Sequence, residues 1–201
     1  MADHELRLLG KNESPAAGDS LAMAFFNDHL LEFLQPDELK RMVFGPWFMT
    51  RGIDLCRRWG ESYTNSDHTG NTGWLTPGNT TISTWRVMRV GLLKLPLKLG
   101  LDGFSRFNAL DSTTAKIHKE VMPGPHWYLL LLGVTRDLQG TGIGSSLIET
   151  GASQASEDGR PCYLGTMTES NVEHYTKRNF EIAAEFEIPS GPKTWAMICQ
   201  P

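Results

Sequence analysis

Three closely spaced glycines, Gly140, Gly142 and Gly144, are the clearest indication of chemistry in this sequence. They follow an apolar run at residues 127–134, which is too bulky for a loop and too short to span a membrane, so it predicts a buried strand. Apolar residues behind the glycines recur at helical spacing. A helix N-terminus offers unpaired N–H groups and about half a positive charge, and glycines let a phosphate approach them closely. This stretch therefore predicts a strand, a turn and a helix that bind a phosphate group.

Two common phosphate-binding motifs fit this stretch poorly. A P-loop needs a lysine and then a serine or threonine after its last glycine, whereas Gly144 is followed by two serines. A dinucleotide fingerprint is nearly matched by Gly140, Gly142 and Ser145, but the next predicted strand, at residues 161–164, does not end in an acidic residue. Too little chain remains after it for a doubly wound domain.

A third motif fits, because Gln139-x-x-Gly142-x-Gly144 resembles the acyl-CoA pyrophosphate signature of the GNAT superfamily of N-acetyltransferases. The resemblance extends from His126 to the C-terminus through the order of strand, signature, helix, strand and the segment at residues 171–180. Within the superfamily, the last third of the chain is most similar to the puromycin N-acetyltransferase branch. The first two thirds resemble that branch loosely.

The resemblance implies a single α+β domain over residues 1–201, with a mixed, largely antiparallel sheet flanked by helices. It also implies an acyltransferase that moves an acetyl group from acetyl-CoA to the primary amine of a small molecule, by direct attack on the thioester. Residues 83–120 would form a variable insert near the acceptor. The implied cofactor-binding residues are Leu132, Gly133, Val134, Gln139, Gly140, Thr141, Gly142, Ile143, Gly144, Ser145 and Asn171.

Tyr175 is the candidate general acid of such a reaction. Tyr175 and Asn171 are four positions apart on one face of a predicted helix that begins near Asn171. A phenol with a reference pKa of ~10 and a thiol with one of ~8.5 are close enough for a proton to pass to the departing sulfur. The alternative interpretation is a tyrosine that only packs and donates one hydrogen bond.

The general base is left open by the sequence. The puromycin branch usually has a glutamate after the Tyr-Leu of its fifth strand, and this chain has Gly165 there. His118, His126 and Glu169 are the remaining candidates, although a lone histidine beside an apolar strand is more often a core residue. The missing glutamate keeps a non-catalytic acyl-CoA sensor as an alternative. Acetylation of a protein N-terminus or lysine is another.

Aromatic side chains are expected around the acceptor if the likeness extends to specificity. Trp74, Trp85, Phe104 and Phe107 would then line an acceptor pocket, although large apolar residues more often belong to a core. Residues 83–120 also mix cations with apolar residues. Such a stretch can lie on a membrane, but cations beside an apolar stripe are usually a solvated face.

The composition favours a soluble protein of one domain. The 201 residues suffice for one domain, and the net charge of −4 gives no general attraction to nucleic acid or anionic lipid. No apolar run approaches the ~20 residues of a membrane span. The first five residues lack the order of a secretion signal, and three cysteines suggest no disulfide framework. We therefore expect a cytoplasmic monomer or homodimer without nucleic-acid or membrane partners and without a metal.

The remaining elements follow from periodicity and turn residues. Strands are expected at residues 5–9, 61–64, 73–76, 180–188 and 194–199. A helix is expected to begin near residue 15, followed by a short helix across residues 27–28. Another is expected from residue 36 to 59, with a kink or break at 45–46. A further short helix should follow a cap at residues 111–114. Pro96 and Gly100 should break any long helix in the middle of the chain.

Overall fold

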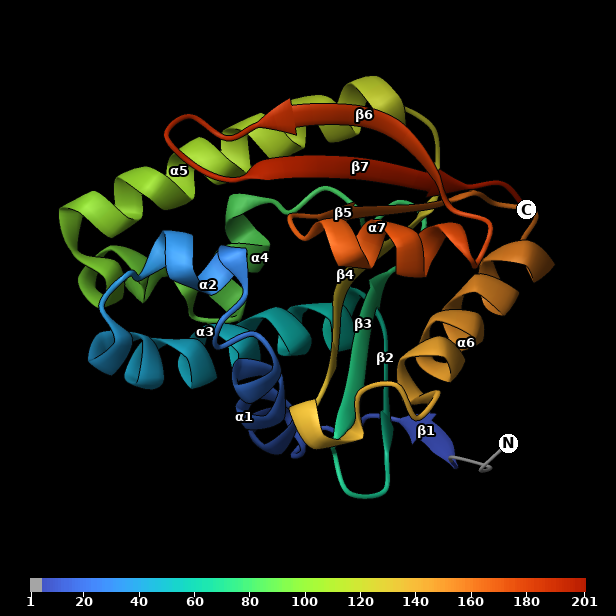
Figure 1. Ribbon diagram of the computed structural model, residues 1–201, viewed down its shortest axis with the longest axis horizontal. Coiled ribbons are helices and arrows are strands. Elements are labelled where there is room, and N and C mark those ends of the chain that lie inside the picture. The colour runs from blue at the N-terminus through green and yellow to red at the C-terminus, as the bar shows by residue number, and fades with distance from the viewer. Residues whose placement is uncertain (1–4) are drawn as a thin grey trace.

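The computed structural model describes residues 5–201, which form a seven-stranded sheet in the order β1-β2-β3-β4-β5-β7-β6 (Figure 1). Strands β4 and β5 run parallel, and every other neighbouring pair is antiparallel. The expected α+β class with a mixed, largely antiparallel sheet is confirmed. The expectation about a secretion signal falls mainly on residues 1–4, outside the described residues. The strands are β1 (Leu6–Leu8), β2 (Gly60–Asn65), β3 (Gly70–Leu75), β4 (Trp127–Val134), β5 (Cys162–Thr166), β6 (Glu181–Glu187) and β7 (Lys193–Cys199).

Helices cover both faces of this sheet (Figure 1). Residues 83–120, the expected insert, contain α4, a short 3-10 turn and most of α5. The helices are α1 (Ser14–Ala24), α2 (His29–Leu34), α3 (Glu38–Trp59), α4 (Thr84–Arg89), α5 (Leu95–Val121), α6 (Ile143–Glu157) and α7 (Glu169–Thr176), with 3-10 turns η1 (Leu92–Lys94) and η2 (Arg136–Leu138).

Two apolar cores hold the layers together. Side chains of α1, α2, α3 and α5 form one core, which Leu131 of β4 joins from the sheet. Side chains of α6 and α7 form the other, around the fully buried Trp74 and its neighbour Trp127. Gly151 lets α6 lie directly on Trp74, because a Cβ there would come within 2.2 Å of the indole ring. The contact fixes α6, and therefore its N-terminus, against the middle of the sheet.

Most of the expected elements are present, and three details differ from expectation. Strand β3 begins at Gly70, because residues expected to form a long turn pair with β2 instead. Helix α3 continues through Pro46 without the expected break, within its apolar packing against α1. Gly100 does interrupt α5, with a φ of 70°, as expected. Asp111 lies inside α5 and caps nothing, since the helix continues from Leu95 to Val121.

The segment around α7 differs from expectation in one detail. The helix begins at Glu169, two residues before the expected start near Asn171. Asn179 follows the helix with a φ of 64°, the left-handed conformation expected for it. Phe180 is buried and contacts the Tyr175 ring, which ties the end of α7 to its middle.

Candidate functional site

Strands β4 and β5 separate half-way along their length. Their parallel pairing ends at Leu129 and Leu164, after which β4 continues to Val134 beside β3 alone. Leu130 is an extra residue in β4, since Trp74 pairs with Leu129 and Gly73 with Leu131. A bulge of this kind bends a strand and increases its twist. One side of the second half of β4 therefore has backbone groups free for a ligand, as the resemblance implied.

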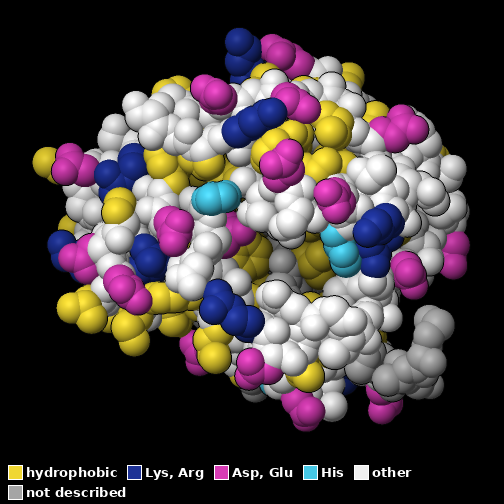
Figure 2. All heavy atoms as spheres, in the orientation of Figure 1, with side chains coloured by type: hydrophobic (Ala, Val, Ile, Leu, Met, Phe, Trp, Pro, Cys, Tyr) yellow, Lys and Arg dark blue, Asp and Glu magenta, His cyan; other side chains and the backbone are white. Residues whose placement is uncertain are grey.

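A cavity of about 850 Å³ fills the gap between the two strands. It opens as a hollow near the centre of the face in Figure 2. Its wall includes ten of the residues that we expected to form the site: Leu132, Gly133, Val134, Gln139, Gly140, Gly142, Gly144, Ser145, Asn171 and Tyr175. Thr141 and Ile143 are not on the wall, and the Ile143 side chain packs into the core under α6.

The glycine turn forms one end of this cavity. Gly140 and Gly142 have φ values of 79° and 99°, which L side chains rarely adopt, and a Cβ on either would meet nothing within 4 Å. Gly142 is the N-cap residue of α6, and no side chain caps the helix there. Gln139 holds the turn against β4 through a 3.1 Å hydrogen bond from its Nε2 to the Val134 carbonyl. The turn thus presents free N–H groups to open space, an arrangement that fits a pyrophosphate.

Three cationic side chains lie on the wall at this end: Arg136, Lys177 and Arg178. Arg178 donates hydrogen bonds to the Ser145 hydroxyl and, at 2.5 Å, to the His174 carbonyl. Its Nε is buried and has no hydrogen-bond partner among residues 5–201. The three positive charges beside the N-terminus of α6 favour an anionic ligand at this end of the cavity.

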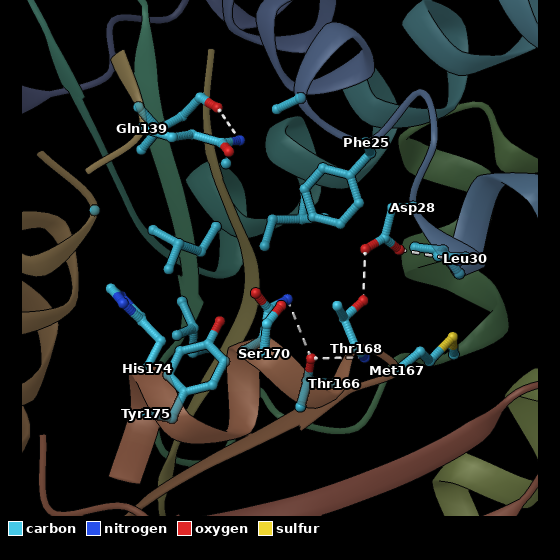
Figure 3. Close-up of a pocket in the computed structure, with 18 of the residues that line it drawn as sticks. Phe25, Asp28, Leu30, Gln139, Thr166, Met167, Thr168, Ser170, His174 and Tyr175 are labelled. Carbon is cyan, nitrogen blue, oxygen red and sulfur yellow. Dashed lines mark hydrogen bonds between the residues drawn. The ribbon is translucent and has the colours of Figure 1, made fainter. Parts of the chain in front are cut away.

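Tyr175 lies on α7 with its hydroxyl directed into the cavity (Figure 3). Burial raises the pKa of this phenol well above its usual value, the negative charge of Asp28 raises it further, and the positive charge of Arg178 lowers it. The phenol therefore keeps its proton over the whole range in which amines lose theirs. Asn171, one turn earlier, has its Nδ2 3.4 Å from Thr166 Oγ1 at the end of β5.

The other end of the cavity carries residues that sequence reasoning did not single out. Asp28 caps α2 by accepting a 2.9 Å hydrogen bond from Leu30 N, and it accepts a second, at 3.2 Å, from Thr168 Oγ1 (Figure 3). Phe25 and His29 lie on the same wall. The only local signal was a cap-forming residue before a short apolar helix, which is also the signal of an ordinary helix start.

The expected candidates for the general base lie elsewhere. His118 and His126 share a 2.7 Å contact between their Nε2 atoms, and His118 stacks on Tyr163 under α5. Neither histidine lies on the cavity wall, and neither does Glu169. These three assignments are wrong for a base acting in this cavity, because none of the three side chains reaches its wall. Gly165 is on the wall, and a Cβ there would meet nothing within 4 Å.

The expected aromatic lining is also wrong. Trp74 is fully buried against α6, and Trp85 is exposed and packs against Trp59. Phe104 and Phe107 are residues of α5, and their side chains pack against the core that α5 shares with α1, α2 and α3. The cavity is instead lined by Phe25, with aliphatic and methionine side chains around it. Periodicity could not separate these roles, because a core position and a pocket position are both apolar.

Two further searches covered the described part of the chain. No helix within residues 5–201 is long and apolar enough to cross a membrane. The same residues contain no group of three or more His, Cys, Asp or Glu side chains placed to hold a metal ion.

Comparisons with known proteins agree on the fold. No family model matches the sequence. An uncharacterized N-acetyltransferase of Schizosaccharomyces pombe is 34% identical over 103 residues, a match that spans 49% of this chain and 41% of the relative. The chain therefore matches less than half the length of that relative.

Solved structures extend the comparison to nearly the whole chain. A histone acetyltransferase and related acetyltransferase of Corynebacterium glutamicum superimposes with a TM-score of 0.74 at 19% identity, over 98% of this chain and 95% of that one. An arylalkylamine N-acetyltransferase of Aedes aegypti gives 0.67 at 16% identity, over 98% of each chain. A polyamine N-acetyltransferase of Drosophila melanogaster gives 0.63 at 10%, over 98% of this chain and 99% of that one. The chain has the fold of GNAT acetyltransferases, and the puromycin branch stays a prediction.

Proposed function

We propose that this protein transfers an acetyl group from acetyl-CoA to the primary amine of a small molecule. The observation that carries the proposal is the gap between β4 and β5, which ends at the uncapped N-terminus of α6 behind Gly140 and Gly142. The two ends of the cavity therefore suit different ligands. A pyrophosphate fits the glycine turn, and an apolar group with an amine fits the end near Phe25 and Asp28.

The residues that would hold the cofactor fit an acyl-CoA. The N–H groups at the start of α6 and the cations Arg136, Lys177 and Arg178 would bind its phosphates. The free side of β4 at Leu132, Gly133 and Val134 would hold the pantetheine arm by strand-like hydrogen bonds. When bound, acetyl-CoA supplies an acetyl group activated as a thioester.

Tyr175 and the free backbone of β4 would then serve the reaction itself. Bringing the amine and the thioester together in one cavity replaces an encounter in solution by a positioned contact. A backbone N–H on the open side of β4 can donate to the carbonyl oxygen as negative charge develops there. The amine loses one proton to solvent before it attacks the carbonyl carbon. As the C–N bond forms and the C–S bond breaks, the Tyr175 hydroxyl, protonated and directed into the cavity, can donate its proton to the departing sulfur and regain one from the nitrogen of the new amide.

A thiol-release assay with a panel of primary amines tests the function. We expect coenzyme A to appear only when an amine is present, together with the acetylated amine by mass spectrometry. Tight binding of acetyl-CoA with no turnover on any amine would favour a sensor. Turnover only on peptides would favour a protein acetyltransferase. The assay must include peptides, because one of the structures with this fold is described as a histone acetyltransferase.

A further inference from the structure

We infer that Asp28 forms the acceptor subsite, and that the subsite takes a cationic monoamine attached to an apolar body. The inference rests on the proposed function and names the substrate class for the same cavity. It starts from a side chain that no sequence motif marks. Asp28 is the carboxylate that α2 places on the wall, half-buried and at the end opposite the cations.

The Asp28 carboxylate has acceptor capacity left over. One oxygen accepts from Leu30 N at 2.9 Å and the other from Thr168 Oγ1 at 3.2 Å. Each carboxylate oxygen can accept two hydrogen bonds, so a position on each stays free. Within residues 5–201, Asp28 forms no ion pair. A half-buried carboxylate without a counter-charge is best satisfied by a cation brought in by the ligand.

Two distant segments fix the position of this carboxylate. Asp28 belongs to the start of α2, and its partner Thr168 follows β5, 140 positions along the chain. Gly165, in β5 and three residues before Thr168, leaves open space where the puromycin branch usually carries a glutamate. A carboxylate is therefore present at this end of the cavity, but it comes from the opposite wall.

The neighbours of Asp28 define the rest of the acceptor. Phe25, Leu30 and Met167 surround it on the wall and offer apolar contact (Figure 3). Glu173, another acidic residue of the wall, is exposed on α7, four residues from Lys177. An amine on an aromatic or aliphatic body satisfies both the charge and the apolar surface. A polyamine would place its second ammonium against Phe25, Leu30 and Met167, which cannot pair with it.

Asp28→Asn tests the subsite without disturbing the fold. Asparagine caps helices as well as aspartate does, with its Oδ1 accepting from Leu30 N. Its Nδ2 then takes the place of the oxygen that faces Thr168 and can donate to that hydroxyl, so both contacts can be kept while the charge is lost. The matched control is Asp37→Asn, which makes the same change at the cap of α3, where Asp37 accepts from Lys40 N at 3.0 Å outside the cavity.

The probes are phenethylamine and its neutral alcohol analogue, 2-phenylethanol. We expect Asp28→Asn to raise the KM for phenethylamine about 10- to 100-fold, the usual range for losing a hydrogen bond to a charged group, and to leave the Kd of acetyl-CoA within about twofold. The wild type should bind the amine in preference to the alcohol, and the variant should lose that preference. Asp37→Asn should match the wild type in all three measurements.

These measurements distinguish a failure of the Asp28 subsite from a failure of the proposed acetyltransferase function. An unchanged KM and an unchanged preference in Asp28→Asn would overturn the subsite while leaving the acetyltransferase intact. If the wild type turns over no amine, calorimetry with phenethylamine in the presence of coenzyme A still compares the two proteins. Equal binding of the amine by both, or no binding by either, would overturn the subsite, and the absence of turnover would overturn the proposed function.

Discussion

Arg178 at the end of α7 donates a hydrogen bond to the hydroxyl of Ser145 in the first turn of α6. The contact joins two helices whose ends meet at the glycine turn. It also holds a guanidinium beside N–H groups that have no partner within the helix. Arg136 and Lys177 lie on the same cavity wall and add two more positive charges. The relationship predicts a role in binding an anion.

Arg178→Gln should weaken acetyl-CoA binding about tenfold or more, because it removes a charge-assisted contact to a phosphate. Isothermal titration calorimetry measures the effect. Arg160→Gln is the control, since Arg160 is exposed and lies off the cavity wall. Equal affinities in the two variants would show that Arg178 only connects α7 to α6.

Gly142→Val should abolish acetyl-CoA binding, because the side chain would enter the open space beside the turn and would strain a residue whose φ is 99°. Gly78→Val is a control for the strain alone, since Gly78 has a φ of 82°, also faces open space and lies outside the cavity wall. Gly144→Ala should bind nearly normally, because its Cβ would make only an ordinary 3.5 Å contact with Val134. Retained affinity in a folded Gly142→Val protein would place the cofactor elsewhere.

Tyr175→Phe should lower kcat about 10²- to 10⁴-fold with an unchanged Kd for acetyl-CoA, since it deletes a positioned proton donor and keeps the ring. Burial raises the pKa of this phenol, so the wild-type rate should not fall with its ionisation until well above pH 10. Tyr63→Phe, off the cavity wall, serves as the control. Normal turnover and an unchanged pH profile in Tyr175→Phe would mean that solvent protonates the thiolate.

The His118 and His126 pair should affect stability and leave catalysis unchanged. His126 Nδ1 lies 2.6 Å from the Gly124 carbonyl and must donate to it, so its Nε2 accepts from His118. Burial lowers the pKa of His118 to about 4, and the positive charge of a protonated His126 is a second, smaller cause of that decrease. Burial also lowers the pKa of His126.

Because the unfolded chain binds protons on these histidines more readily, the free energy of unfolding should fall as the pH drops from about 6.5 towards 4. Urea unfolding at pH 7 and at pH 5 measures this change. His118→Phe keeps an aromatic ring on Tyr163 and should reduce the pH dependence, with kcat within about twofold of wild type. A loss of turnover of a hundredfold or more would return His118 to the candidates for the general base.

The structure bears out the local prediction of a strand, a glycine turn and a helix around the three glycines. The run at residues 127–134 folds as β4, and Gly140 and Gly142 form the turn before α6, because strand length, glycine conformation and helical spacing are local properties. Tyr175, on the short helix after β5, is on the cavity wall, and its role as the general acid stays a prediction. Asn179 adopts the left-handed conformation that the end of a helix requires.

Only the tertiary structure decided which ionisable side chains reach the cavity. Asp28 and Thr168 are 140 residues apart, and their contact depends on how α2 packs beside the gap in the sheet. His118 and His126 have the residue type of a base, yet His118 packs on Tyr163 and bonds to His126, and neither reaches the cavity wall. Trp74 has the character of a pocket residue and packs under Gly151 instead. Sequence periodicity reports which face of an element is apolar, whereas pairing between distant segments determines whether that face meets a core or a ligand.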